Sequence, residues 1–158
     1  MFKKLLSTMG ISLLLLSLPV VASVTEISCD NDTTNDNYCS NQLSYIHSWD
    51  LISEPYYSWS GDYRVNQWPD DGWYGWEIKT GVSSSSPVSM TYTVYLNSEN
   101  FHDQHADYYV DGVWKKTLNQ ETAPVYNAIG SSSNYGTISI RVIDNDGYTG
   151  ADMARVNW

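Results

Sequence analysis

The chain has 158 residues and a net charge of −10, with 8 Lys and Arg against 18 Asp and Glu. This length suits one domain, and the acidic balance repels nucleic-acid phosphates and anionic lipids, so neither is an expected partner. Seven Trp and thirteen Tyr accompany only two Phe. Because Trp and Tyr carry a polar tip, this composition favours aromatic rings that meet water or a ligand as well as a core.

The first 23 residues have the order of a secretory signal peptide. Lys3 and Lys4 precede an apolar run over 11–21, and Ala22 and Ser23 follow it. The run is shorter than the about 20 residues that span a bilayer, so no membrane insertion is expected. Removal of residues 1–23 would leave 6 Lys and Arg against 18 Asp and Glu, a net charge of −12. We therefore expect a protein that is secreted or periplasmic.

Residues 24–41 are expected to form an acidic leader. In an exported protein, Cys29 and Cys39 are expected to form a disulfide, which would stabilise the fold by at most about 3 kcal/mol. The residues between the two cysteines are polar and turn-forming, without the alternation that predicts a strand. The segment is therefore interpreted as a solvated loop closed by one bridge.

From residue 42 onward, alternating polar and apolar residues predict β-strands, and no segment has a helical pattern. In the clearest predicted strand, over 88–96, the even-numbered residues such as Val94 face one side of the sheet, and the odd-numbered residues such as Tyr95 face the other. Asp111-Gly112 predicts a hairpin with a type I′ turn. Together with one short strand within 54–72, the predicted strands cover 43–51, 73–80, 88–96, 107–110, 113–116, 137–143 and 152–158. About seven to eight strands over 42–158 predict an all-β, antiparallel, immunoglobulin-like β-sandwich.

Two segments of the C-terminal half, 108–114 and 135–147, resemble bacterial immunoglobulin-like and PKD-type domains of secreted proteins. The first contains the hairpin Tyr-Val-Asp-Gly, and the second ends in Asp-Asn-Asp-Gly. The spacing is also similar to that of the immunoglobulin-like N-terminal module of bacterial chitinases. The resemblance covers about residues 86–158 and implies a sandwich used in adhesion, spacing or polysaccharide binding, not in catalysis. The aromatic-Asp-Phe-Gly-Asp-Gly element of PKD domains is absent, so only the architecture is carried over.

Ten Trp or Tyr occur in the 32 residues from Tyr45 to Trp76. Many of them lie in Gly- and Pro-interrupted sequence, where rigid aromatic rings could stack on the apolar faces of sugars and nearby carboxylates could accept sugar hydroxyls. Some of these rings are expected to fill the core instead, as Trp commonly does in a sandwich. The candidate ligand-binding residues are Trp59, Tyr63, Trp68, Asp70, Asp71, Trp73 and Trp76.

Catalytic and metal sites have weaker patterns. Glu54, Glu77, Glu99 and Glu121 are scattered, whereas a glycosidase needs two carboxylates on either side of the scissile bond. Three groups could hold a metal if their segments turn suitably, but each is also typical of an ordinary polar loop. They are Asp30 with Asp32 and Asp36, His102 with His105 and Asp107, and Asp144 with Asp146. No enzyme, metal or cofactor is therefore predicted.

The preferred hypothesis is a secreted, non-catalytic module that binds an extracellular polysaccharide or cell-surface glycan through surface Trp and Tyr. Asp62, Asp70 and Asp71 favour a neutral or cationic saccharide over an acidic one. Two alternatives remain open: a protein-interaction or adhesion module without a glycan ligand, since Trp and Tyr also dominate protein interfaces, and a small secreted hydrolase.

Overall fold

The computed structural model describes residues 25–32, 37–43, 49–56, 58–68, 72–97 and 99–158, so the expected signal peptide lies outside the described residues. Within these ranges the chain forms β-strands and no helix, and therefore no helix that could cross a membrane. The strands are β1 (Glu26–Asp30), β2 (Cys39–Leu43), β3 (Asp50–Ser53), β4 (Asp62–Asn66), β5 (Trp73–Lys79), β6 (Val88–Tyr95), β7 (Ala106–Val110), β8 (Val113–Leu118), β9 (Tyr126–Asn134), β10 (Thr137–Ile143), β11 (Thr149–Ala151) and β12 (Met153–Asn157).

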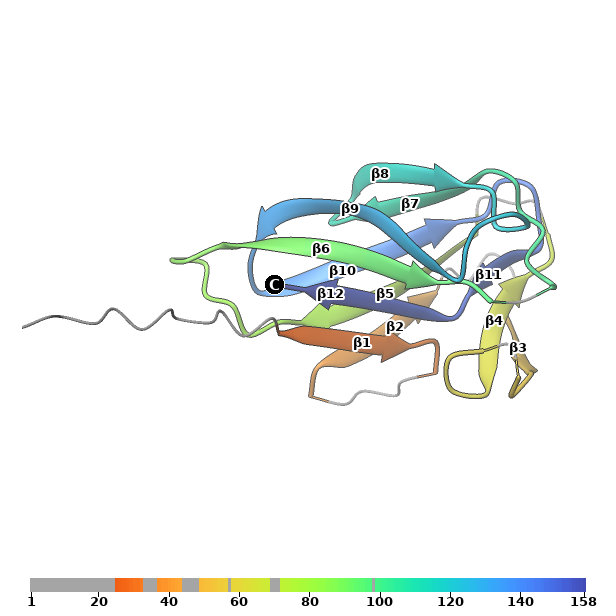
Figure 1. Cartoon of the computed structure of the whole chain (residues 1–158), viewed down its shortest axis with the longest axis horizontal. Helices are drawn as coiled ribbons and strands as arrows, with labels where there is room; N and C mark the ends of the chain where they lie inside the picture. The colour runs from red at the N-terminus through yellow and green to blue at the C-terminus, as the bar shows by residue number, and fades with distance from the viewer. Residues whose placement is uncertain (1–24, 33–36, 44–48, 57, 69–71, 98) are drawn as a thin grey trace, which may run out of the picture.

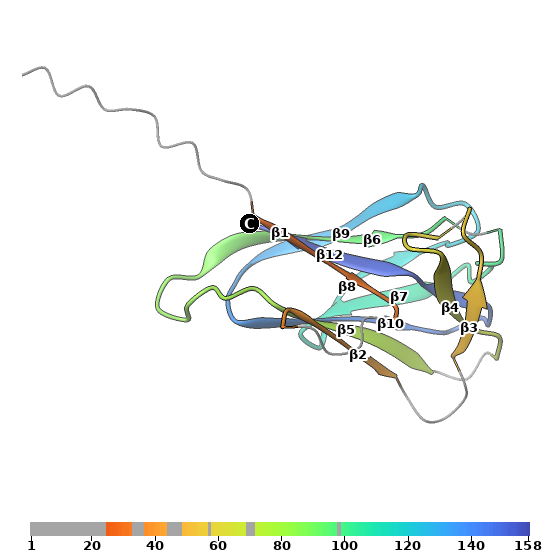
Figure 2. The same ribbon diagram turned by 90° about the horizontal axis from the view of Figure 1, so that it is seen from below.

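Three antiparallel sheets make up the fold, with the strand orders β1-β12-β6-β9, β2-β5-β10-β7-β8 and β11-β4-β3. The first two form the layers of a sandwich (Figure 2). The small third sheet lies across the end that is farther from the C-terminus (Figures 1 and 2). The predicted all-β antiparallel sandwich is confirmed, although the described residues hold twelve strands because several short strands have little alternation of their own.

The core lies between the inner faces of the two large sheets and follows the period-2 patterns of the sequence. In β6 the side chains of Met90, Tyr92 and Val94 are buried, while their neighbours in the strand are half-buried or exposed. On the opposite layer, β10 contributes Ile138, Ile140 and Val142. Each of these side chains is at most 1% exposed, so burial of alternate residues gives the two sheets their facing sides.

The predicted hairpin at Asp111-Gly112 is confirmed. Both residues have positive φ, 51° and 76°, as a type I′ turn requires, and they join β7 to β8. The Asp111 carboxylate also accepts hydrogen bonds from the backbone amide of Ser139 and the side-chain amide of Asn134. These contacts fix the hairpin against the start of β10 and the end of β9.

The N-terminal segment differs from the prediction. The disulfide between Cys29 and Cys39 is confirmed, but both cysteines belong to strands: β1 pairs with β12 and β2 pairs with β5. The bridge therefore joins edge strands of the two opposite layers. The predicted strand over 43–51 is also corrected, since Leu43 ends β2 and Asp50 begins β3 in another sheet, with 44–48 outside the described residues.

Candidate functional site

The structure separates the aromatic candidates into exposed and buried groups. Trp59 and Trp68 are exposed and Trp73 is half-buried, whereas Tyr63 and Trp76 belong to the core. The remaining candidates, Asp70 and Asp71, lie outside the described residues.

Strand register explains why Trp76 and Tyr63 are buried. Trp76 lies in β5 between Tyr74 and Ile78 on the inner face, with the Tyr74 ring 5.1 Å away between centroids. Tyr63 lies on the inner side of β4, where its ring meets Phe101 edge-to-face at 4.9 Å. Neither ring therefore offers an open face to a ligand.

Trp59 belongs to an exposed aromatic cluster on the outer face of the sheet β1-β12-β6-β9. Its ring centroid lies 5.5 Å from that of Tyr95 and 6.3 Å from that of Tyr126, and the two tyrosine centroids are 5.2 Å apart, all in edge-to-face contacts. The Arg155 guanidinium lies 5.3 Å from the Trp59 ring and 5.6 Å from the Tyr126 ring, within the range of a cation–π contact. We call Trp59, Tyr95, Tyr126 and Arg155 the Trp59 face.

Register also explains how three strands supply this face. Tyr95 of β6 pairs with Tyr126 of β9 on one side and with Met153 of β12 on the other, so all three point outward. Met153 is nevertheless fully buried. The outer surface of the sheet is therefore covered at this row, at the end where the loop carrying Trp59 crosses it.

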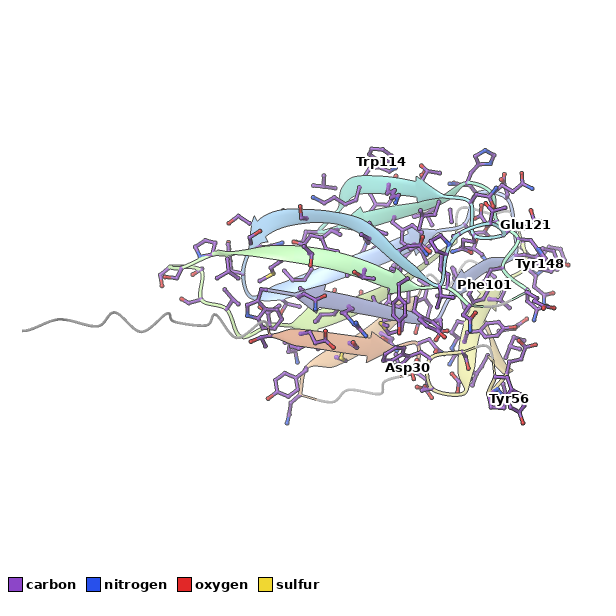
Figure 3. The ribbon with its side chains drawn as sticks, in the orientation of Figure 1. Asp30, Tyr56, Phe101, Trp114, Glu121 and Tyr148 are labelled. Carbon is purple, nitrogen blue, oxygen red and sulfur yellow. A yellow bond between two sulfur atoms is a disulfide. The ribbon has the colours of Figure 1, made fainter. Side chains whose placement is uncertain are left out.

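Hydrogen bonds to two carboxylates anchor that loop, which connects β3 to β4. The backbone amide of Trp59 donates to both carboxylate oxygens of Asp152, at 3.0 and 3.1 Å, and the Ser60 hydroxyl donates to Asp30 at the end of β1 (Figure 3). The loop is closed by the amide of Glu54, which donates to the carbonyl of Gly61 at 3.0 Å. Trp59 is thus held in place by its backbone as well as by its ring contacts.

The hydrogen bonds to the two anchoring carboxylates offset only part of the energetic cost of burying them. Burial raises the pKa of Asp152 to about 8, against the lowering effect of the hydrogen bond from Trp59. Burial likewise raises the pKa of Asp30 to about 6. Arg155 has its own partners on β1: it donates to the Ser28 hydroxyl at 2.9 Å and lies 3.7 Å from the Glu26 carboxylate. Its charge is therefore balanced within the sheet.

A small pocket lies near Tyr148, at the end of the sandwich where the small third sheet lies (Figure 3). It has a volume of about 180 Å³ and is lined by side chains that include Tyr63, Asn100, His102 and Tyr148. The Asn100 amide donates to the Tyr63 hydroxyl at 2.6 Å, and the rings of His102 and Tyr148 meet edge-to-face at 5.9 Å. The pocket is large enough for a small polar group but not for several sugar rings.

Those residues considered for catalysis and metal binding that the structure describes do not all converge on one centre. Glu99 and Glu121 line a second pocket, of about 260 Å³, while Glu54 hydrogen-bonds to Asn100 elsewhere. His105 pairs with the Asp146 carboxylate, which raises the pKa of that imidazole. Among the residues that the structure describes, no group of three or more His, Cys, Asp or Glu side chains is close enough to hold a metal ion.

No family model and no curated protein matches the chain. The fold is similar to part of a xanthan lyase from Paenibacillus, with a TM-score of 0.62 and 16% identity over 84% of this chain and 13% of that one. It is similar to part of a GH26-CBM35 β-(1,4)-mannanase from Podospora anserina, with a TM-score of 0.53 and 10% identity over 83% and 27%. It is also similar to a CBM35 from Paenibacillus barcinonensis, with a TM-score of 0.52 and 14% identity over 82% and 95%.

These likenesses show the β-sandwich fold. The chain spans a small part of the lyase and the mannanase but nearly the whole of the separate CBM35, a carbohydrate-binding module. The resemblance to immunoglobulin-like and PKD-type domains is confirmed only as a sandwich architecture, because no such family is identified.

Three residues of the Trp59 face, Tyr95, Tyr126 and Arg155, were absent from the predicted site. The alternation of its strand already predicted that Tyr95 points away from the protein core, and an outward-facing aromatic residue in such a strand could have marked it as a candidate binding residue. Tyr126 had no local signal, because its position beside Tyr95 depends on the pairing of β6 with β9, which joins distant parts of the sequence.

Proposed function

We propose that this protein is a secreted, non-catalytic carbohydrate-binding module, and that the Trp59 face binds an extracellular polysaccharide. The observation that carries the proposal is an exposed indole held rigidly among two tyrosines and an arginine on the outside of the sandwich. The likeness of the fold to a CBM35 also supports this proposal.

The physical argument rests on preorganisation. Trp59 is 39% exposed and Tyr126 49% exposed, so apolar ring surface is open to solvent. The backbone bonds of Trp59 to Asp152 restrict the loop before a ligand arrives, which lowers the ordering cost of binding. Sugar C–H faces would stack on the rings, and the hydroxyls of Tyr95 and Tyr126 would hydrogen-bond to sugar hydroxyls.

Charge selects a neutral ligand. The chain carries a net charge of −10, and Arg155 already interacts with Glu26 and Ser28, so the charge of this arginine is balanced within the protein before an acidic sugar arrives. We therefore favour a neutral polysaccharide over a uronate-rich or sulfated one.

The test is retention on insoluble chitin, cellulose and peptidoglycan, together with Trp fluorescence titrations against soluble oligomers of each. Tyr126→Ala should weaken binding about tenfold by removing one ring of the face. Tyr135→Ala is the matched control, because Tyr135 is also 49% exposed and lies at the turn between β9 and β10. Binding to none of the polysaccharides, or equal loss in both variants, would overturn the proposal.

A further inference from the structure

A second set of aromatic side chains lies on the outer face of the other large sheet. Arg141 of β10 pairs with Gly75 of β5 on one side and with Tyr109 of β7 on the other, and Tyr109 pairs with Trp114 of β8. Residues paired directly across strands share a face, so these positions form one row across four strands. We call Trp73, Tyr109, Trp114 and Arg141 the Trp114 face.

Gly75 allows one end of this row to be flat. The Arg141 guanidinium lies 4.3 Å from the centre of the Trp73 ring, a cation–π contact. A Cβ at Gly75 would lie 3.1 Å from Cγ of Arg141 and 3.3 Å from Cζ3 of Trp73. The missing side chain therefore lets the indole and the arginine stem lie closely over the strand.

At the other end of the row, Trp114 is 55% exposed and projects outward from β8 (Figure 3). Its indole N–H donates to the Asp107 carboxylate at 3.2 Å, and that carboxylate also accepts from the Thr117 hydroxyl. Trp114 is thus an oriented ring with its polar atom already paired within the sheet, which leaves its apolar surface for contact with a partner.

We propose that the Trp114 face is a second binding surface for a neutral polysaccharide, so that one molecule bridges two polysaccharide chains; this rests on the proposed function. The sheets β1-β12-β6-β9 and β2-β5-β10-β7-β8 are the two opposite layers of the sandwich (Figure 2). Because the Trp59 face is on the outer side of the first and the Trp114 face on the outer side of the second, one polysaccharide chain lying on a layer cannot cover both. The strands β5, β10, β7 and β8 are separated by three inter-strand spacings of about 4.8 Å each, so the face extends for about 14 Å across the sheet. An extended chain of several sugars fits along this length.

Charge on this sheet supports a neutral ligand. Outward-facing Arg141 and Lys79 are balanced by Glu77 and Asp107 in the same sheet. A second copy of this chain is the less favourable occupant, because two molecules of net charge −10 repel each other.

The experiment uses the polysaccharide that the wild-type protein retains. Isothermal titration with its soluble oligomers should give two sites per protein for the wild type, of which Trp114→Ala removes one and Tyr126→Ala weakens the other about tenfold. Protein held on the insoluble polysaccharide should capture a fluorescent soluble form of it, and Trp114→Ala should lower this capture about tenfold or more.

Thermal unfolding of each variant separates a lost site from a lost fold, and Tyr135→Ala should keep both sites and the capture. One site in the wild type, unchanged by Trp114→Ala, would overturn the second surface while leaving the Trp59 face intact. A concentration-dependent dimer that Trp114→Ala abolishes would overturn it as well, in favour of self-association. Loss of all binding in Trp114→Ala alone would instead contradict the Trp59 face.

Discussion

Asp152 offers a direct test of how the loop that carries Trp59 is held. Its side chain is fully buried and accepts two contacts from the Trp59 amide, and burial raises its pKa to about 8 from 3.8. A carboxyl that stays protonated in the folded protein while it ionises in the unfolded chain opposes folding as the pH rises. The stability that it contributes is fully present below about pH 4 and is lost between pH 4 and 8.

The size of this effect follows from the pKa. Each unit of difference between the folded and unfolded pKa is worth about 1.4 kcal/mol, so the rise from 3.8 to about 8 sets an upper bound of about 6 kcal/mol. Relaxation and water entry around a carboxylate at the end of a sheet reduce such penalties, and we expect about 2 kcal/mol at pH 8. Asp152→Asn keeps an oxygen that can accept from the Trp59 amide but cannot ionise.

Differential scanning calorimetry between pH 4 and 8 measures the outcome. At pH 8 the Asn variant should unfold about 6–10 °C above the wild type, and the difference should shrink toward pH 4. Asp50→Asn, which removes the same charge from an exposed position on β3, should not reproduce this gain. An Asn variant that is less stable than the wild type at pH 8 would show that the ionised carboxylate stabilises the loop, and our reasoning would be refuted.

Two further predictions concern the framework. Gly150→Ala places a methyl group against the ring of Phe101 and should destabilise the fold by about 2–4 kcal/mol in urea unfolding; an unchanged midpoint would contradict this close packing. Replacing Cys29 and Cys39 by alanine should lower the free energy of unfolding by about 2–3 kcal/mol. A double variant with wild-type stability would mean that the pairing of β1 and β2 alone fixes the N-terminal segment.

Local signals in the sequence were sufficient for much of the fold. The Asp111-Gly112 turn was predicted correctly because type I′ geometry needs two consecutive residues that tolerate positive φ. The strand Val88–Tyr95 was predicted because its burial alternates along the chain. The strand Cys39–Leu43 was missed because polar residues dominate it, and its pairing with β5 comes from the rest of the sheet.

The candidate site was harder to predict than the fold. Crowding of Trp and Tyr could not separate Trp59, which lies on a loop, from Trp76, which lies inside β5. The alternation of Tyr74, Trp76 and Ile78 was present in the sequence and would have placed Trp76 in the core. By contrast, the contact of Trp59 with Tyr126 depends on a loop and a strand that meet only in the folded molecule.

The arrangement of β1 and the disulfide has a mechanical consequence. Thr25 and Trp158 exchange two backbone hydrogen bonds, each 2.9 Å long, at the beginning of the β1–β12 pair. A force that pulls these two residues apart would open the pair one rung at a time instead of shearing it. Opening would stop at Cys29, where a covalent bond transfers the load to β2 in the opposite layer. In an oxidised protein under tension, the part of β1 that extends before both layers bear the force is limited to the few residues before Cys29.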